Sequence, residues 1–273
     1  MKPKSALSGL KIAVIGAGNM GAALVRGLVE KSVYPQNISV FDIDRKKLDV
    51  LKKEGVRIAK SNRQGVSLAD VVILAVKPQI LQEAVGEIAT AVGKDTLVIS
   101  IAAGVPMAKI EQFFNKPVCL VRAMPNMPAL AGQGMSAFSL GRHANQRHRR
   151  IAEAVLSSFG EAAQVPERAL DLVTAVSGSG PAYFFLLAEK MIEAAYELGM
   201  KVDLAKKLVY QTALGSGTMM ASTGEDPEEL VSRVASKGGT TEAALRVFQK
   251  KGFGRVVQDA VKAAYKRSIE LRK

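Results

Sequence analysis

Some residue types are scarce in this sequence, and each scarcity narrows the range of functions. Cys119 is the single cysteine, so no disulfide can form within the chain, and a reducing compartment is favoured. Only two histidines occur, His143 and His148, and no cysteine or carboxylate lies between them. Because such spacing is poor for metal ligation, we expect no metal site there.

Long apolar runs are missing as well. By inspection, no run approaches the roughly 20 apolar residues that a membrane-spanning helix needs. The stretch from Met1 to Leu10 carries two lysines but lacks the apolar segment of a secretory signal. We therefore expect a cytoplasmic protein that has no membrane partner.

Acidic residues are outnumbered, with 25 against 38 basic residues and a formal net charge of +13. Such a charge favours either a negatively charged partner, such as nucleic acid or a phosphate ligand, or simply a solvated basic surface. The densest basic stretch, Arg142 to Arg150, lacks interleaved aromatic residues, and no nucleic-acid-binding motif accompanies it. We therefore expect no nucleic-acid partner.

The first part of the chain alternates short apolar runs with helical segments. Near-continuous apolar runs, such as VVILAV at 71–76, are typical of strands that helices cover on both faces. Strands are predicted at 11–15, 38–41, 71–76, 97–101 and 118–121. Helices are predicted at 22–31, 48–54, 80–92 and 107–114. The alternation predicts the α/β class, with a doubly wound parallel sheet of the Rossmann type.

The pattern changes after about Pro166, where strand-like runs nearly vanish. The residues that follow are rich in Ala, Leu, Met, Glu and Lys, which suit helices, and glycines separate the segments. Helices are predicted at 182–198, 204–222, 227–234, 241–250 and 254–272. We therefore predict two domains, an α/β domain at 1–165 and an all-helical domain at 166–273, without a flexible linker.

A glycine-rich motif follows the first predicted strand and opens the first predicted helix. Gly16 permits a tight turn, Gly18 lets a pyrophosphate approach the backbone, and Gly21 lets the helix pack close to the strand. The N-terminus of the helix then offers free N–H groups to the phosphates. The sequence thus predicts a nicotinamide-dinucleotide site that includes Gly16, Ala17, Gly18, Asn19, Met20 and Gly21.

Asp42 ends the second predicted strand, where an acidic side chain can accept hydrogen bonds from the adenosine ribose hydroxyls. A carboxylate there would repel a 2′-phosphate, so NADH is slightly favoured over NADPH. The basic residues Arg45, Lys46 and Lys47 leave NADPH open, because one of them could still meet a phosphate. The alternative interpretation of Asp42 is an ordinary turn residue beside Asp44.

Six segments together carry a more specific signal. They are GAGNMG (16–21), AVKPQ (75–79), SIAAGV (100–105), RAMPNMP (122–128), SGSGPAY (177–183) and VSRVASKGGTTEAAL (231–245). In this order, over about residues 11–270, the chain resembles pyrroline-5-carboxylate reductase. SKGGTTEAAL is the most specific piece.

The resemblance implies a Rossmann domain followed by a helical domain that dimerises through interlocking helices, and members commonly assemble further into decamers. It implies reduction of 1-pyrroline-5-carboxylate to L-proline by NADH or NADPH, the last step of proline synthesis, in the cytosol of a microbe. Asp42 departs from relatives that use NADPH, which tend to carry Ser, Thr or Asn-Arg patterns there. That departure bears on the cofactor preference and not on the reaction.

The segment before the predicted helix 241–250 is the candidate substrate site. N–H groups at Gly239 and Thr240 could hold the substrate carboxylate with help from the helix dipole, and Ser236 could add a hydroxyl. The resemblance implies that Thr241 hydrogen-bonds the ring nitrogen and is the catalytic residue. The alternative is that these residues simply cap a helix near Glu242. The full candidate set is Ser236, Gly238, Gly239, Thr240 and Thr241.

The resemblance also places further residues at the cofactor. It puts Met124, Pro125 and Asn126 beside the nicotinamide, and Asn62 at the adenosine end, although a solvated loop asparagine is an equal alternative. Lys77 and Pro78 follow the predicted strand 71–76 at an edge of the sheet where ligands bind, and a backbone contact with the cofactor is favoured over a catalytic role for Lys77. The candidate cofactor residues of this segment are Ala75, Val76, Lys77 and Pro78.

Two other functions stay open from the sequence. One is an oxidoreductase for another small imine or for a 2-oxo or 2-hydroxy acid. Related hydroxyacid dehydrogenases place a lysine one turn after the glycines of a segment such as SGSGPAY, where this chain has Ala182, Tyr183 and Phe184. The other is a dinucleotide sensor without turnover, which would not need the Gly-Gly-Thr-Thr segment.

Overall fold

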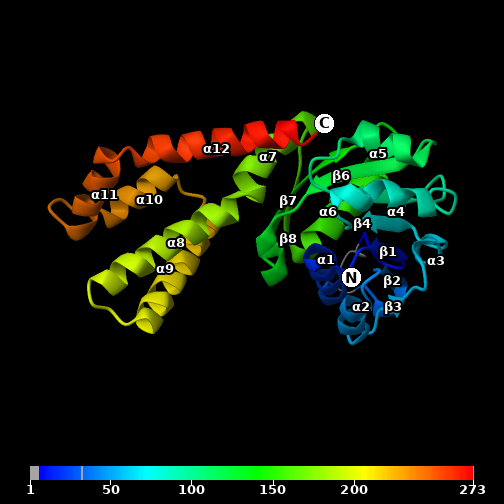
Figure 1. Ribbon diagram of the computed structural model, residues 1–273, viewed down its shortest axis with the longest axis horizontal. Helices are drawn as coiled ribbons and strands as arrows, with labels where there is room; N and C mark the ends of the chain where they lie inside the picture. The colour runs from blue at the N-terminus through cyan, green and yellow to red at the C-terminus, as the bar shows by residue number, and fades with distance from the viewer. Residues whose placement is uncertain (1–5, 32, 273) are drawn as a thin grey trace. The chain divides into compact units, whose positions relative to one another are not determined.

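A computed structural model describes residues 6–31 and 33–272 of the chain (Figure 1). They form two compact units, which we call unit 1 and unit 2. Unit 1 contains the residues up to Ser179 together with those from Ala264 onward, and unit 2 is Gly180–Ala263. The predicted functional boundary near residue 165 therefore differs from the boundary of the compact units, because the first helical turns after 165 pack with the sheet.

Unit 1 is built on one eight-stranded sheet with the order β3-β2-β1-β4-β5-β6-β7-β8. All neighbouring strands are parallel except β6 and β7, which are antiparallel. The strands are β1 (Ile12–Ile15), β2 (Ile38–Phe41), β3 (Arg57–Ile58), β4 (Val71–Leu74), β5 (Leu97–Ser100), β6 (Cys119–Met124), β7 (Gly134–Leu140) and β8 (Gly160–Gln164). The predicted doubly wound sheet is confirmed, and β3, β7 and β8 are additions to the predicted strands.

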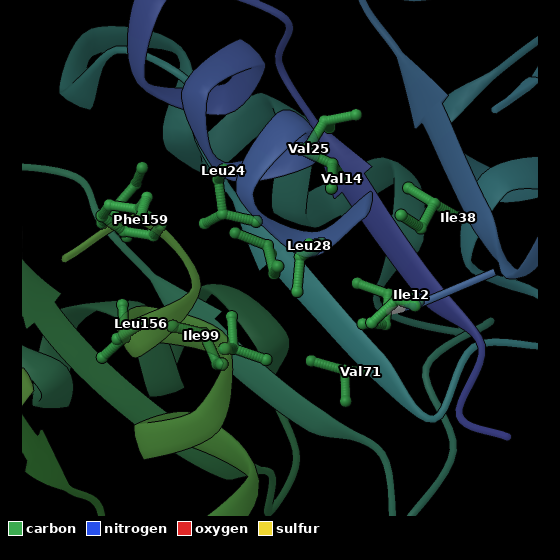
Figure 2. Close-up of a cluster of buried hydrophobic side chains, with 14 of the residues drawn as sticks. Ile12, Val14, Leu24, Val25, Leu28, Ile38, Val71, Ile99, Leu156 and Phe159 are labelled. Carbon is green, nitrogen blue, oxygen red and sulfur yellow. The ribbon is translucent and has the colours of Figure 1, made fainter. Parts of the chain in front are cut away.

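Helices cover both faces of this sheet, which explains why the central strands β1 and β4 are apolar and buried at every position. In β1, Ile12 and Val14 belong to one buried cluster, and Ala13 and Ile15 belong to the other. Figure 2 shows the first cluster, in which side chains of α1 lie against β1 and its neighbours. The covering helices are α1 (Asn19–Glu30), α2 (Arg45–Lys52) and α6 (Gln146–Leu156) for the first cluster, and α3 (Asn62–Val66), α4 (Leu81–Ile88) and α5 (Met107–Phe114) for the second.

Short helical turns connect several of these elements. They include the 3₁₀ turns η1 (Pro35–Asn37), η2 (Pro78–Ile80), η3 (Met127–Ala131), η4 (Ser157–Phe159) and η5 (Glu167–Ala169). Next come α7 (Leu170–Val173) and the π-helical turn η6 (Thr174–Gly178), which stands directly before the long helix α8. By length and composition, the stretch Glu167–Glu197 is apolar enough to cross a membrane, with a mean hydropathy of 1.3. The expectation that no run is long and apolar enough was therefore wrong.

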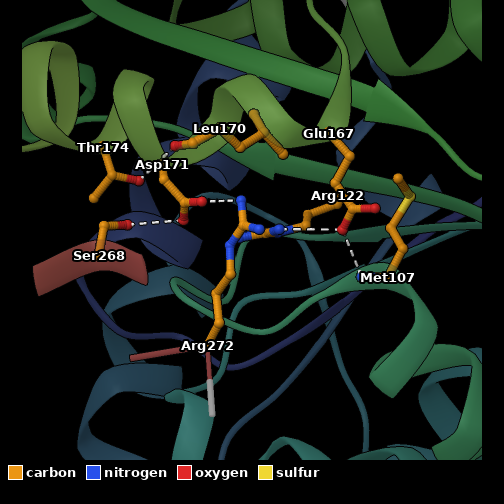
Figure 3. A network of polar contacts seen from close by, with 8 residues as sticks. All are labelled: Met107, Arg122, Glu167, Leu170, Asp171, Thr174, Ser268 and Arg272. Atoms are coloured by element: carbon orange, nitrogen blue, oxygen red, sulfur yellow. Dashed lines mark hydrogen bonds and ion pairs between the residues drawn. The ribbon is translucent and has the colours of Figure 1, made fainter. Parts of the chain in front are cut away.

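A buried polar network fastens the C-terminal residues within unit 1 (Figure 3). Asp171 accepts a hydrogen bond from the Ser268 hydroxyl at 3.0 Å and forms an ion pair with Arg272. Nearby, Glu167 Oε1 accepts from the Met107 N–H at 2.8 Å and from Arg122 Nη1 at 3.1 Å. Burial lowers the pKa of the Arg122 guanidinium from its ordinary value, and Glu167 opposes that effect. Because buried charges need partners, the loss of either carboxylate would destabilise unit 1.

Unit 2 consists of α8 (Gly180–Glu197), α9 (Val202–Thr223), α10 (Pro227–Val234), α11 (Thr240–Lys250) and most of α12 (Phe253–Glu270). The predicted helices are confirmed here to within a few residues at each end. Helices α8 and α9 lie side by side as a hairpin (Figure 1). In the described helices α8 to α11, only Gly180, Ala205 and Val209 are buried. The apolar side chains of unit 2 are thus mostly left uncovered within the single chain.

Candidate functional site

The glycine-rich turn has the geometry that its motif predicts. Gly16 has a φ of +101°, and a Cβ atom there would lie 2.6 Å from the Ala75 carbonyl oxygen. A Cβ atom on Gly21 would overlap the Gly16 carbonyl oxygen, whereas one on Gly18 would meet nothing within 4 Å. Gly16 and Gly21 are therefore required by the close packing of the turn, and the backbone at Gly18 is open to an approaching ligand.

Asp42 holds this turn in place. The Ala17 N–H donates to Asp42 Oδ2 at 2.7 Å, and the Asp44 N–H donates to Asp42 Oδ1 at 2.8 Å. Lys47 Nζ lies 3.9 Å from Oδ1. The side chain thus organises the turn with Asp44, as the turn interpretation has it, and also reaches across to the glycine-rich turn, while its contact with the ribose stays a prediction. Each carboxylate oxygen keeps a further lone pair for a ligand.

The first turn of α1 is open to an anion. Its N-cap, Gly18, has no side chain, so no side-chain oxygen caps the helix. The first N–H groups of a helix lack intrahelical acceptors, and the partial positive charge at this end attracts phosphate. The Ala17 N–H, in contrast, already donates to Asp42.

The turn lies where the order of the strands reverses, between β1 and β4. The Ala75 N–H donates to the Ile15 carbonyl oxygen at 2.8 Å, which joins the two strand ends. In doubly wound sheets, ligands bind in the crevice outside the carboxyl ends of the strands at such a reversal. Ala75, Val76, Lys77 and Pro78 follow β4 at this edge, and Lys77 is exposed.

A small cavity opens beside Asp42, with a volume of about 120 Å³. Its polar lining includes Asp42, Asn62, Glu83 and Glu87, and its apolar lining includes Ile43, Val76 and Ile80. Asn62 is 7% exposed, so it is not a solvated loop residue. Its Nδ2 donates to Glu87 Oε2 at 2.8 Å, and its buried Oδ1 has no hydrogen-bond partner in the described part of the chain.

The glycine cradle and the unpaired Asn62 acceptor fit a dinucleotide whose pyrophosphate lies at the turn and whose adenosine lies at the cavity. Sequence reasoning found Asp42 and Asn62 but missed Glu83 and Glu87. These two residues lie one turn apart on α4, and only their position opposite Asn62 distinguishes them from other surface glutamates.

The segment 124–126 begins with the last residue of β6, at the same edge of the sheet. Asn126 Oδ1 accepts from the Met135 N–H at 2.8 Å. Asn126 Nδ2 donates to the carbonyl oxygen and the hydroxyl of Ser177, at 3.3 and 3.2 Å. The asparagine thus ties the loop to the π-helical turn. A Cβ atom on Gly178 would lie 2.7 Å from Met124 Cε, so the methionine side chain packs closely over this glycine of the SGSG segment.

The candidate substrate segment lies in unit 2, and two details differ from expectation. The N-cap of α11 is Gly239, with no side-chain cap, so the capping interpretation of Thr241 is wrong. The Gly239 N–H is not bare, because it donates to the Ser236 carbonyl oxygen at 3.0 Å. The Gly238 N–H donates to Glu242 Oε2 at 2.6 Å. The open N–H groups are those of the first turn of α11, beginning at Thr240.

The side chain of Thr241 is half-buried and lines an apolar groove between α9, α10 and α11, whereas Thr240 is exposed. Gly238 has a φ of +73°, and a Cβ atom on Gly239 would lie 2.6 Å from Ser236 Oγ. The two glycines therefore shape the turn that leads into α11. The predicted cofactor residues all lie in unit 1, and the predicted substrate residues all lie in unit 2.

Two titratable side chains outside the candidate site, Cys119 and Lys190, have pKa values that their local surroundings shift. Burial raises the pKa of the Cys119 thiol above its ordinary value, so this cysteine is a poor nucleophile. Lys190 is exposed and forms an ion pair with Glu193 at 2.8 Å, which raises its pKa. Across the described residues, no group of three or more His, Cys, Asp or Glu side chains is placed to hold a metal ion.

Comparison with known proteins identifies the family. Residues 167–271 match the family described as pyrroline-5-carboxylate reductase dimerisation, and residues 11–104 match the family described as NADP oxidoreductase coenzyme F420-dependent. A pyrroline-5-carboxylate reductase of Pseudomonas aeruginosa is 42% identical over 96% of both chains. The structure of a pyrroline-5-carboxylate reductase from Coxiella burnetii is 36% identical, with a TM-score of 0.91 over 97% of this chain and 99% of that one.

A Plasmodium falciparum pyrroline carboxylate reductase, solved with NADP bound, is 28% identical, with a TM-score of 0.86 over 97% of this chain and 99% of that one. These likenesses span both units, and they join the dinucleotide cradle of unit 1 to the dimerisation helices of unit 2. The chain belongs to the pyrroline-5-carboxylate reductase family.

Proposed function

We propose that this enzyme reduces 1-pyrroline-5-carboxylate to L-proline with a nicotinamide cofactor, as the final step of proline synthesis. The observation that carries the proposal is the glycine cradle at the strand reversal, in a chain that belongs to this family over nearly its full length. When bound, the reduced nicotinamide supplies a hydride to the C=N carbon. The protein contributes binding, orientation and electrostatics.

The cofactor residues have separate tasks. The first turn of α1, with Gly18, Asn19, Met20 and Gly21, holds the pyrophosphate, and Asp42 accepts from a ribose hydroxyl. Residues 75–78 and Met124–Asn126 line the course of the dinucleotide along the sheet edge. Asn126 does so as a positioning residue, because its amide is already used in holding the loop.

The substrate residues lie at the start of α11. We assign the substrate carboxylate to the open N–H groups that begin at Thr240, with the Ser236 hydroxyl nearby, and Gly238 and Gly239 shape the turn that exposes them. Thr241 is the catalytic side chain. Its hydroxyl hydrogen-bonds the ring nitrogen and can either donate or accept, so it suits the imine and the amine alike.

We propose that NADH is preferred over NADPH. Asp42 stands at the end of β2, and the cavity beside it also contains the carboxylates of Glu83 and Glu87. No basic side chain is among the residues described as lining that cavity. A 2′-phosphate would meet these negative charges, and Lys47 already lies near Asp42 and Asp44.

The assembly and location follow from the same reasoning. We propose that the functional domains divide near residue 165, that residues 166–273 form the dimer, and that dimers associate further into decamers. We assign the apolar stretch Glu167–Glu197 to the dimer and not to a membrane span, and the match of residues 167–271 to the dimerisation family supports this assignment. A cytoplasmic location without nucleic-acid or membrane partners agrees with a biosynthetic reductase.

One assay tests the reaction and the cofactor preference together. Purified enzyme is mixed with the five-membered imino acid, and the absorbance of NADH or NADPH is followed while proline is measured by mass spectrometry. We expect proline formation with both cofactors and a higher kcat/KM with NADH. If neither cofactor is oxidised, the proposed activity is wrong. If NADPH gives the higher kcat/KM, the proposed preference is wrong.

A further inference from the structure

The polar lining of the cavity beside Asp42 consists mainly of hydrogen-bond acceptors. Asp42, Glu83 and Glu87 contribute carboxylates, which are acceptors when ionised. Asn62 adds a buried Oδ1 that has no partner in the described part of the chain. A ligand group that enters this cavity must therefore bring a donor, because an acceptor would leave Asn62 Oδ1 unpaired.

Glu87 fixes which end of the Asn62 amide is left free. Its carboxylate can accept but not donate, and Asn62 Nδ2 donates to Glu87 Oε2 at 2.8 Å. The reverse orientation of the amide would place oxygen against oxygen. The pairing therefore leaves the oxygen, and not the nitrogen, as the free end of an amide that lines the cavity. The side chain is 7% exposed, so water does not readily compensate this atom.

The remaining walls suit a flat aromatic ring. Ile43, Val76 and Ile80 supply apolar surface, and the volume of about 120 Å³ is far below the roughly 300–1,000 Å³ of pockets that enclose a whole ligand. The cavity thus holds one part of a larger molecule. Because it adjoins Asp42, the residue assigned to the ribose, the part in question is the purine base attached to that ribose.

We propose that Asn62, oriented by Glu87, accepts a hydrogen bond from the exocyclic 6-amino group of the cofactor's adenine, so that this site selects 6-aminopurine over 6-oxopurine dinucleotides. This inference rests on the proposed function. In adenine the 6-amino group is the donor of the base edge, whereas hypoxanthine carries an acceptor oxygen at the same position. Glu87 is a positioning residue, because it acts through Asn62.

The experiment compares NADH with reduced nicotinamide hypoxanthine dinucleotide, whose nicotinamide, ribose and phosphate groups are the same. Equilibrium dissociation constants are measured without imino acid, from the fluorescence of the bound reduced nicotinamide. We expect the hypoxanthine cofactor to bind at least about tenfold more weakly, as for the loss of one hydrogen bond to a buried acceptor. The stabilisation of the protein by each cofactor against heat gives an independent readout.

Three variants locate the source of the discrimination. In Asn62→Leu, which removes the acceptor, the ratio of the two dissociation constants should fall to about one. In Glu87→Gln the ratio should fall as well, because a glutamine amide can donate to Oδ1 and release the orientation. Glu83→Gln is the matched control, since it removes the same charge from the same cavity and helix without touching the Asn62 amide, and it should keep the wild-type ratio.

The outcomes separate this inference from the proposed function. Equal dissociation constants for the two cofactors in the wild-type protein would overturn the inference and leave the reductase activity standing. So would a wild-type ratio in both Asn62→Leu and Glu87→Gln, which would assign Oδ1 to a ribose hydroxyl instead. Failure of NADH itself to bind would count against the cofactor site, and with it against the proposed function.

Discussion

The two units of this chain differ in how far they bury their apolar side chains. In unit 1, helices cover both faces of the sheet, and side chains such as Leu24, Ile73 and Phe138 are fully buried. In unit 2, Phe184 is 65% exposed and Leu214 is 63% exposed. Each buried large apolar side chain contributes about 1.5–3 kcal/mol, so unit 2 forgoes most of this stabilisation as a single chain. Its sequence therefore requires a second copy, in agreement with the dimerisation family.

The uncovered surface of unit 2 includes a groove of about 500 Å³ between α9, α10 and α11. Met219, Met220, Leu230 and Val231 line it, and Thr241 lies at the same groove. Methionines adapt to a changing surface, which suits an interface. The proposed dinucleotide site thus consists of residues of unit 1 alone, whereas the candidate substrate segment belongs to the unit whose apolar side chains are mostly exposed.

The largest effect is expected from a substitution that disrupts association through unit 2. Leu214→Arg places an unpaired charge on the apolar face of α9, and burial of such a charge costs about 3–5 kcal/mol, or more than a hundredfold in the dimerisation constant. Sedimentation analysis should show dissociation to monomers. Leu68→Arg is the matched control, because Leu68 is as exposed as Leu214 but belongs to unit 1. If both variants kept the wild-type assembly, the comparison between the units would be wrong.

The next largest effect tests whether unit 2 supplies the catalytic side chain while unit 1 binds NADH. Thr241→Ala should lower kcat about a hundredfold, as for the loss of one hydrogen-bond donor at a reacting group, and should leave the dissociation constant of NADH unchanged. Thr240→Ala, at the exposed neighbouring position, should have a small effect. Steady-state kinetics and NADH fluorescence titration give the two quantities. Equal losses in turnover and in NADH affinity would remove the catalytic role from Thr241.

A smaller effect is expected in unit 1 itself. Asp42→Ser removes the carboxylate that accepts from the Ala17 and Asp44 N–H groups, so NADH should bind about tenfold more weakly, as for one lost charge-assisted hydrogen bond. The preference should shift toward NADPH, because the repulsive charge is gone. Asp44→Ser keeps an N-cap for α2 and is the control. An unchanged ratio of NADH to NADPH affinity in Asp42→Ser would contradict the assignment.

The smallest effect concerns the stability of unit 1. His148 completes the capping box of α6 by accepting from the Asn145 N–H at 3.2 Å, and burial lowers its pKa below the ordinary value. Between the lowered pKa and about 6.5, the unfolded chain binds a proton that the folded chain does not. Stability is therefore full above about pH 6.5 and falls as the pH is lowered through this window.

Urea unfolding at pH 7.5 and pH 5.5 measures this dependence. His148→Gln should cost about 1 kcal/mol at pH 7.5 through the weakened cap and should lose less stability on acidification than the wild type. His143→Gln changes the exposed neighbouring histidine and should retain the wild-type pH dependence. An identical loss on acidification in all three proteins would exclude His148 as the cause.

Local sequence patterns predicted most of the helices and strands but not all of them. The strands β1, β2, β4, β5 and β6 and the helices of unit 2 have clear apolar or helix-forming runs, so they were predicted to within a few residues, whereas α6 was not predicted. Strand β8, GEAAQ, is partly exposed and polar, and β7 contains small and polar residues, so neither has the apolar run that the prediction relied on. The pairing of these strands in the sheet, and not their own composition, makes them strands.

Some features of the candidate site were likewise predicted from the sequence, and others were not. The spacing of Gly16, Gly18 and Gly21 predicted the glycine-rich turn, because backbone conformation and close approach restrict Gly16 and Gly21 to glycine. The burial of Asn62 and its bond to Glu87 join residues 25 positions apart and leave no pattern in the sequence. The hydrogen bond from the Gly239 N–H to the Ser236 carbonyl oxygen is local, but it too leaves no pattern in the sequence.

The sequence by itself determined the class of fold, the glycine-rich turn and the order of an α/β part followed by a helical part, since these depend on local periodicity and on glycines. Only the tertiary structure decided which polar atoms are paired and which are left free. Pairing depends on distances between segments that are remote along the chain. For that reason the unpaired Asn62 oxygen and the uncovered faces of α8 and α9 became visible only after folding placed their neighbours.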